Sequence, residues 1–361
     1  MKGIRKMKKM KSLISIVLVL VLALSLTACG EKTTPETPAT PAETETPASE
    51  TPDASAEVGE YNWNLAIDSP EDTVTFLYGK KFADLVSEAS GGKMKIQIFA
   101  NGTLGGDREA LESCLGGDVN FIVQTTAPQV NFMPKLAVFD LPVAYATIDE
   151  VRAALDNSDF MSTINQVYAD GGYKLLGYAD QSFRIMSTNK KVESMDDFKG
   201  QKIRTMENPN HLAFWKALGA NPAPMAFAEV YIGLQQGTID AQENPYEVIV
   251  ANKLYEQQKY VVQTNHIPHI LSLITNKALY DGLNDAEKAI IDEAVTEAKA
   301  YAREQADSRA EERMNAIKDS GTEVVPVSAE LYEQIKTAVQ PVFDEIRSQV
   351  GDDLVDAYLG E

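Results

Sequence analysis

The fold of this chain is decided by MDDFKGQKIRTMENPNHLAFWKALGANPAPMAFAEVYIGLQQGTIDAQENP, residues 195–245. Within it, Lys202–Arg204 is predicted to form a short buried strand whose last side chain projects from the edge of a sheet. Asn221–Pro224 is predicted to be extended, because a residue that precedes proline is pushed out of the helical region. The stretch therefore places Arg204 beside a wall shaped by proline and glycine.

The second half of this stretch supplies a helix and another strand end. Ala228–Gln236 is predicted to be a helix that Gly237 ends. Asp240–Pro245 is predicted to be a strand that runs into a turn. Small ligands of open α/β sheets lie at the carboxyl ends of strands, so the pattern favours a binding pocket at this edge.

Outward from this stretch, strand and helix patterns alternate along the chain. Such alternation is typical of an α/β fold with largely parallel sheets. We expect strands at Trp63–Ile67, Met94–Phe99, Asn120–Val123 and Tyr173–Gly177, and helices from after residue 67 to about Ser90 and at Asp107–Leu115, Ile148–Asn157 and Phe160–Asp170.

Two extended apolar runs, Phe183–Thr188 and Ile270–Thr275, are placed to link one sheet with another. Leu283–Ile317 is predicted to be one long helix, with Asn284 as its N-cap. About 34 residues at 1.5 Å each reach roughly 50 Å, enough to run across two lobes; a surface helix on one lobe is the alternative. A last helix at about Ser328–Val350 is expected to pack back.

Residues 1–28 are predicted to be a signal peptide. They start with a basic segment, continue with an apolar run too short for a comfortable membrane span, and end within LTACG at 26–30, which resembles a bacterial lipobox. We expect Cys29 to become the first mature residue and to carry a lipid anchor on the outer face of a membrane. An ordinary cleaved signal, with Cys29 incidental, is the alternative. Residues 29–60 are rich in Thr, Pro, Glu and Ala, and are expected to be a disordered tether.

The net negative charge of the chain restricts the classes of partner that it can bind. The formal net charge is −20, and removing residues 1–28, which hold six basic and no acidic residues, makes it −26. This balance argues against nucleic-acid binding. An anionic ligand would have to be drawn by a local site, and screening over about 8 Å makes that possible.

The sequence lacks the motifs of familiar catalytic and metal sites. It has no C-x-x-C, no G-x-S-x-G and no P-loop, and His211, His266 and His269 lack metal-ligand spacing. We therefore expect neither an enzyme nor a metal or cofactor. A secreted hydrolase that uses a pair of its many carboxylates is the alternative. Cys114 is expected to be a buried, unreactive side chain.

Six motifs point to one family: KIR at 202–204, ALGANPAPMAFAEVY at 217–231, QENP at 242–245, NGTLGGDRE at 101–109, FDLP at 139–142 and TNH at 264–266. Together they resemble the solute-binding proteins of tripartite ATP-independent periplasmic (TRAP) transporters, of the C4-dicarboxylate receptor (DctP) type. The resemblance covers about residues 61–350. It implies a two-lobe fold like that of periplasmic binding proteins, with hinge strands and a helix spanning both lobes, a small organic acid as ligand, and a membrane permease as partner.

By this resemblance we expect one lobe from residues 61–183 together with about 271–361, and a second lobe from 184–270. The spanning helix is expected at 284–317. A permease is the expected partner, with a signalling receptor as the alternative. Like most members of the family, the chain is expected to be a monomer.

The resemblance also assigns roles in a binding site. Arg204 stands where the family's arginine pairs with the ligand carboxylate, and a guanidinium fork matches a carboxylate with two parallel hydrogen bonds; a structural salt bridge is the alternative. Arg184 matches a second pocket arginine, with an interlobe salt bridge as its alternative. Asn244 matches an asparagine that bonds the ligand, although it could instead cap the following helix. Phe227 matches an aromatic residue that flanks the ligand, with a core position as its alternative.

Contacts from the first lobe are expected at Asp68 and at Gln124 or Thr125, which follow predicted strands. Glu243 joins the candidate site as a residue that orients an arginine. An acid at position 68 would repel a carboxylate and suits a hydroxyl or an amine, which favours hydroxylated sugar acids over plain dicarboxylates. Departures from the family pattern, such as Thr205-Met206 where V-P is usual, leave the identity of the ligand open.

Overall fold

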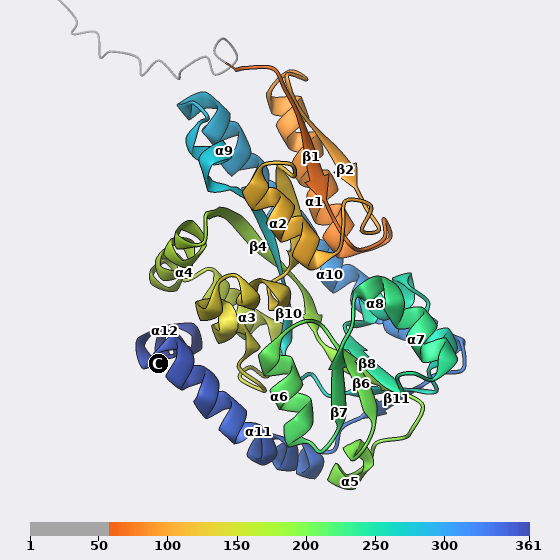
Figure 1. Cartoon of the computed structure of the whole chain (residues 1–361). Coiled ribbons are helices and arrows are strands. Elements are labelled where there is room, and N and C mark those ends of the chain that lie inside the picture. Colours follow the sequence, from red (N-terminus) through yellow and green to blue (C-terminus); the bar gives the residue numbers. More distant parts are fainter. Residues whose placement is uncertain (1–57) are drawn as a thin grey trace, which may run out of the picture. The chain divides into compact units, whose positions relative to one another are not determined.

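A computed structural model describes residues 58–361. The predicted signal peptide, the lipid-bearing Cys29 and nearly all of the tether lie outside these residues. The described part is a mixed α/β protein with two sheets, as expected (Figure 1). Within this part, no helix combines the length and the apolar character needed to cross a bilayer.

The first sheet has five strands in the order β2-β1-β3-β10-β4. β1 is parallel to β2 and β3, whereas β10 is antiparallel to both β3 and β4. The predicted strands are confirmed here, and β4 runs further than expected. Their bounds are Tyr61–Ala66 (β1), Met94–Phe99 (β2), Phe121–Thr125 (β3), Tyr173–Phe183 (β4) and Pro268–Asn276 (β10).

The second sheet has six short strands in the order β11-β9-β5-β8-β6-β7. β6 is parallel to β7 and β8, and β5 is antiparallel to β8 and β9. This sheet contains the KIR and QENP motifs at the ends of two adjacent parallel strands. The bounds are Ile185–Thr188 (β5), Lys202–Thr205 (β6), Asn221–Pro224 (β7), Ala241–Asn244 (β8), Tyr260–Gln263 (β9) and Glu323–Pro326 (β11).

Helices cover both sheets. Those associated with the first sheet are Val74–Ala89 (α1), Asp107–Gly116 (α2), Ile148–Leu155 (α3), Ser158–Asp170 (α4), Lys277–Asp281 (α9) and Asp352–Leu359 (α12), with 3-10 helices at Ala127–Asn131 (η1) and Pro134–Asp140 (η2). Those associated with the second sheet are Met195–Phe198 (α5), Pro209–Ala217 (α6), Val230–Gln236 (α7) and Tyr246–Ala251 (α8), with 3-10 helices at Phe227–Glu229 (η3) and Leu254–Gln257 (η4).

Both faces of the first sheet are buried, which explains why β10 is a continuous apolar run. Ile270 and Ile274 pack into the core on one face, whereas Leu271 and Leu273 pack into the core on the other. All four side chains are fully buried. Cys114 lies in the first of these cores and is buried, as expected.

The chain passes between the sheets at the two runs predicted to link them. β4 leads through Arg184 directly into β5, and residues 264–267 lead from β9 into β10. A non-glycine residue with left-handed backbone lies at each of these places: Ser182, at φ +66°, next to the last residue of β4, and Asn265, at φ +42°, between β9 and β10. This conformation is uncommon for residues other than glycine, and here it redirects an extended chain from one sheet to the other.

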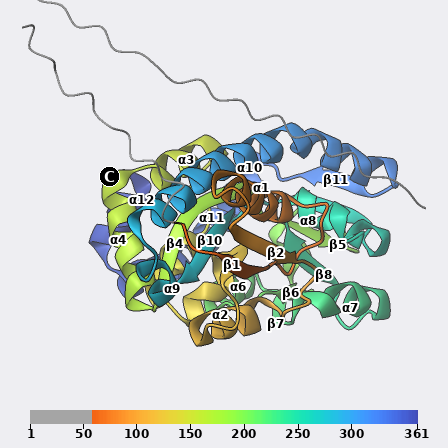
Figure 2. The same cartoon turned by 90° about the horizontal axis from the view of Figure 1, so that it is seen from above.

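The predicted long helix is confirmed as α10, Asp285–Asp319, which has 35 residues. Its N-terminus is closed by a capping box between Asn284 and Glu287, as the sequence predicts. α10 packs against α1 and β4 of the first lobe and against α8 and β11 of the second (Figure 2). A buried ion pair, Arg313 Nε to Glu247 Oε2 at 3.0 Å, fixes it to α8.

The C-terminal part is divided between the lobes, whereas the sequence analysis grouped residues 271–361 with the first lobe. β11 pairs with β9 in the second sheet. Helix α11, Ala329–Val350, packs Ile335 into the core of the second lobe and Ile346 into that of the first. A four-residue edge strand has no local signal for the sheet that it joins, so this membership is set by tertiary packing alone.

Candidate functional site

The two lobes meet around a cavity of about 460 Å³ at the carboxyl ends of β1, β6 and the segments that follow them. Asp68, Asp107 and Arg108 line it from the first lobe, and Arg204 and Phe227 line it from the second. A smaller recess of about 30 Å³ continues from it, because both share Asp68, Asp107, Arg204 and Phe227; Thr125, Asn244 and His269 complete the recess.

Arg204 is a buried arginine whose guanidinium is only half used by the protein. Its Nε and Nη2 donate to the carbonyl oxygen of Met225 at 2.9 and 2.7 Å. Its Nη1 is buried and has no hydrogen-bond partner in the described part of the chain, where no carboxylate forms an ion pair with it either. Burial lowers the pKa of Arg204 to about 10, so that the group is still a cation at neutral pH. A buried cation without a counter-ion is a site ready for an anion.

Phe227 covers this guanidinium. Its ring centroid lies 5.7 Å from Cζ of Arg204, which is a cation–π distance. The side chain is partly exposed and lines the cavity. Phe227 therefore both packs against the core of the second lobe and lines the cavity beside Arg204.

Arg184 differs from Arg204 because its guanidinium is fully occupied. Its Nε and Nη2 donate to the two carboxylate oxygens of Glu243, the second at 2.9 Å, and Nη2 also donates to the Glu243 carbonyl oxygen at 2.6 Å. Its Nη1 contacts Nδ1 of His269. Arg184 lies behind the wall of the cavity and reaches it only through Asn244, whose Oδ1 accepts from Nη2 at 3.1 Å.

Asn244 presents its amide at the recess. Besides accepting from Arg184, it donates to Oε1 of Gln242 at 2.7 Å. The alternative role as a helix cap is not seen, because the N-cap position of α8 is Pro245 and no side chain caps it.

Glu243 is the centre of a buried charge cluster. Nε2 of His266 lies 3.2 Å from Oε2, and Nδ1 of His211 lies 3.6 Å from Oε1. Burial alone would raise the pKa of Glu243, but Arg184 and the two histidines hold it well below the ordinary value. The carboxylate is thus kept charged and holds Arg184 in place.

Two first-lobe acids face Arg204. Asp68 accepts from Ser69 Oγ at 3.0 Å, and Asp107 stands at the first position of α2. Burial raises the pKa of both, and the charge of Asp68 raises that of Asp107 further, although Arg204 opposes the shift. Burial and the mutual repulsion of the two acids therefore favour their protonated forms.

Asp107 was missed as a site residue by the sequence analysis, although it lies in the NGTLGGDRE motif. Of the two residues predicted after β3, Thr125 lines the recess. Gln124 lies behind it, where its amide nitrogen, in the orientation that satisfies both ends of the group, donates to Oδ1 of Asp107 at 3.2 Å. Gln124 thus supports the acid pair from behind.

Polar contacts between the lobes line the mouth of the cavity. Arg108 Nη2 lies 2.6 Å from Glu207 Oε2, and both side chains are about half exposed. Asn131 donates to the carbonyl oxygen of Glu207, and Asn208 donates to that of Ala127 at 2.9 Å. The lobes are therefore closed over the cavity in this structure.

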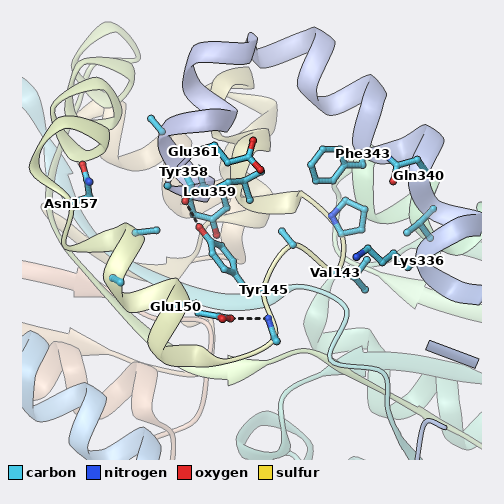
Figure 3. A pocket seen from close by; sticks show the side chains of 18 of the residues that line it. Val143, Tyr145, Glu150, Asn157, Lys336, Gln340, Phe343, Tyr358, Leu359 and Glu361 are labelled. Carbon is cyan, nitrogen blue, oxygen red and sulfur yellow. Dashed lines mark hydrogen bonds between the residues drawn. The ribbon is translucent and has the colours of Figure 1, made fainter. Parts of the chain in front are cut away.

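A second hollow, of about 790 Å³, lies outside the cleft between α3, α11 and the C-terminal residues (Figure 3). Tyr145, Phe343 and Tyr358 form much of its wall, and Lys336 is the one cation among its lining residues, all of which are described. Lys336 and Glu361 are exposed to solvent. Although this hollow is larger, it contains no buried charge that could fix an anion, so we assign the ligand site to the interlobe cavity.

The comparisons with known proteins agree with this geometry. Residues 65–349 match the model of the family described as bacterial extracellular solute-binding protein, family 7. The 2,3-diketo-L-gulonate-binding periplasmic protein YiaO of Escherichia coli is 31% identical over 68% of this chain and 75% of its own length. The C4-dicarboxylate-binding periplasmic protein DctP of Rhodobacter capsulatus is 30% identical over 77% of this chain and 84% of its own.

A solved structure matches nearly the whole described part. The sugar acid binding protein DctPAm of Advenella mimigardefordensis, in complex with galactonate, superposes with a TM-score of 0.81 at 29% identity, covering 84% of this chain and 98% of its own. The family model spans well over half of the sequence. The chain therefore belongs to the family 7 extracellular solute-binding proteins, the binding-protein components of TRAP transporters.

Proposed function

We propose that this protein captures a small organic acid between its lobes, holds the acid's carboxylate on Arg204, and delivers it to a TRAP permease. The observation that supports this most directly is the Nη1 of Arg204, a residue that lines the interlobe cavity; this nitrogen is buried and has no hydrogen-bond partner and no carboxylate of the described chain paired to it. The free edge of a guanidinium is a hydrogen-bond match for a carboxylate. Phe227 and Asn244 would flank the bound acid.

The two acids of the first lobe narrow the class of ligand. Asp68 and Asp107 face the cavity opposite Arg204, so a ligand with a second carboxylate would bring additional negative charge against them. Hydroxyl groups can donate to both acids. We therefore propose a hydroxylated monocarboxylate, such as an aldonate or a uronate, in preference to a plain dicarboxylate.

Solved relatives with galactonate, D-erythronate and β-D-galacturonate are consistent with this choice, whereas a relative with succinate shows that the fold alone does not decide it. Thr125 would add a contact from the first lobe, and Gln124 would hold Asp107. Arg184 and Glu243 would hold Asn244 in place from behind the cavity wall.

We further propose that the mature protein is a monomer tethered to the outer face of the membrane by lipid on Cys29. The lipobox-like LTACG and the tether composition support the anchor. Intact-mass analysis of the membrane fraction tests it. A diacylglyceryl mass on the N-terminal cysteine is expected, and a mature chain that begins beyond residue 29 would contradict it.

A thermal-shift screen tests the ligand assignment. D-galactonate, D-erythronate, D-galacturonate, D-glucuronate and succinate are added one at a time; a ligand at 100 times its dissociation constant should stabilise the fold by about 2.7 kcal/mol. The stabilising acid should lose its effect on Arg204→Ala and keep it on Lys202→Ala, an exposed cation two residues earlier on the same strand. Stabilisation by succinate alone would overturn the preference for hydroxylated acids. Chemical turnover of the bound acid would favour the alternative function, a secreted hydrolase.

A further inference from the structure

All three histidines of the chain meet in one buried cluster beside the ligand cavity. His211 comes from α6, His266 from the passage between β9 and β10, and His269 from β10. Each of them contacts Glu243 or the Arg184 that Glu243 holds. Three histidines from separate segments thus converge on the pair that supports the ligand site.

His211 is the member of this cluster that lies against a carboxylate of each lobe. Its Nε2 lies 3.2 Å from Oδ1 of Asp140, at the end of η2 in the first lobe, and its Nδ1 lies 3.6 Å from Oε1 of Glu243 in the second. The other oxygen of Asp140 accepts from Asn208 and Asn210 at 2.7 and 2.9 Å. One imidazole therefore stands between a carboxylate of each lobe, an arrangement that favours protons on both ring nitrogens.

The position of His211 in the chain links it to closure. Residues 207–211 follow the strand that ends near Arg204, and they make the polar contacts across the cleft. Glu207 meets Arg108 at the exposed mouth, Asn208 meets the Ala127 carbonyl further in, and His211 meets Asp140 at the buried end. Nδ1 of His211 is buried without a hydrogen bond, so a small movement would be enough to complete the bridge to Glu243.

We propose that His211 is a positioning residue that couples closure of the lobes to the ligand site: closure brings Asp140 against it, it takes up its second proton, and the resulting imidazolium fixes Glu243 and, through it, Arg184 and Asn244. The inference rests on the proposed function, since it concerns how a two-lobe receptor organises its site. It adds a cross-lobe element to that function, in which the site is fully ordered only in the closed form.

The charges around His211 give the coupling a pH dependence. Burial opposes its protonation, but Asp140 and Glu243 raise its pKa to about 9. An imidazole that lacks Asp140 should titrate nearer the ordinary value of about 6.5. Between these two pKa values, closure of the lobes is accompanied by the uptake of one proton by His211. The affinity for the ligand therefore falls as pH rises from about 6.5 to about 9, by up to about tenfold per pH unit. The other groups that face His211 are Arg184 from the β4–β5 passage and His266 and His269, whose pKa values burial lowers, so that they are uncharged at neutral pH.

Because the chain has only three histidines, ¹⁵N-histidine NMR can follow each ring, and His211→Gln identifies the signal of interest. The closed form is obtained without any ligand by joining Arg108→Cys and Glu207→Cys with a short bismaleimide in a Cys29→Ser background. We expect His211 to keep both protons up to about pH 9 in the cross-linked protein and to titrate at least one unit lower without the cross-link. Equal titration in both forms would overturn the proposal.

The second measurement is the affinity for D-galactonate at pH 7 and pH 9, in wild type, His211→Gln and Asp140→Asn. We expect the affinity of the wild type to fall about tenfold or more between pH 7 and pH 9. In both variants the fold-change in affinity should be at least threefold smaller. Wild-type and variant curves of equal slope would contradict the coupling. If no acid of the screen binds, the ligand assignment fails, while the cross-link experiment still decides the role of His211.

Discussion

The guanidinium of Arg184 and the carboxylate of Glu243 form two parallel hydrogen bonds inside the lobe junction, and both side chains are almost completely buried. Arg204, in the same sheet, lacks such a partner and opens onto the cavity. Two arginines with the same side chain thus differ in what each can offer a ligand. The difference predicts opposite outcomes when each is removed.

Arg204→Ala should abolish ligand binding with little effect on the fold. Truncating one partner of a buried hydrogen-bonded charge pair costs about 2–5 kcal/mol of binding, so affinity should fall by roughly thirtyfold or more. The free energy of unfolding without ligand should change by less than about 1 kcal/mol, because no carboxylate of the described chain forms an ion pair with the removed cation and the two acids that face it have raised pKa values. Calorimetric titration and urea unfolding check the two parts, with Lys202→Ala as the control. Unchanged affinity would mean that the carboxylate is anchored elsewhere.

Arg184→Met should instead destabilise the protein. It leaves Glu243 buried without the guanidinium that bonds both of its oxygens, with only His211 and His266 beside it, for which the expected cost is about 3–5 kcal/mol of unfolding free energy. Urea unfolding of the ligand-free protein measures it, and Arg204→Ala serves as the matched comparison, an equally buried arginine without an ion pair. A variant of normal stability that no longer binds the acid would show that Arg184 contacts the ligand directly.

Many of the helices and strands were predictable from the sequence because their signals are local. Proline and glycine spacing placed the strand that ends near Arg204, and the capping pair at Asn284 and Glu287 placed the start of α10. The family resemblance supplied the role of Arg204, and the structure adds that half of its guanidinium is free.

What the sequence did not reveal depends on contacts between distant segments. Arg108 and Glu207 are 99 residues apart, and Asp140 and His211 are 71 apart. Each is an ordinary charged or polar residue in its own surroundings, and only closure of the lobes gives it a partner. Asp107 could have been suspected as a site residue, because an acid at the start of a helix that follows a glycine-rich turn faces a strand edge. Its pairing with Asp68 could not, because Asp68 follows a different strand and is distant in the sequence.

Asp107→Asn should raise the stability of the fold at neutral pH but weaken the binding of a hydroxylated acid. The pKa of Asp107 is raised well above its ordinary value, first by burial and then by Asp68. A raised pKa means that the contribution of Asp107 to stability is fully present below about pH 4 and is lost as pH rises through the folded-state value. The variant cannot ionise, so its melting temperature should exceed that of wild type at pH 7–8 and approach it in acid.

The same variant should bind a hydroxylated acid less well, because the amide accepts hydrogen bonds more weakly than a carboxylate. A hydrogen bond to a charged group contributes about 1.5–3 kcal/mol, so a loss of about tenfold or more is expected for D-galactonate at pH 8. Succinate should bind the variant no worse than it binds wild type. A gain in stability with no change in the affinity for either acid would remove Asp107 from the ligand site.

The ion pair between Arg108 and Glu207 should act on release of the ligand more than on its capture. The pair joins the lobes at the mouth, so it can form only after the lobes have closed. Exposed pairs contribute about 0.2–1 kcal/mol. Arg108→Ala should therefore speed dissociation by up to about fivefold, leave association nearly unchanged, and lose most of this effect in 1 M salt, where screening acts over about 3 Å.

Stopped-flow kinetics at low and high salt measures these rates. The control is Lys80→Ala, which removes an equally exposed ion pair with Asp84 that lies within α1 and joins no lobes. It should change neither rate. If Arg108→Ala instead slowed association and left dissociation alone, Arg108 would be attracting the acid to an open cleft, and the closed contact with Glu207 would add nothing to retention.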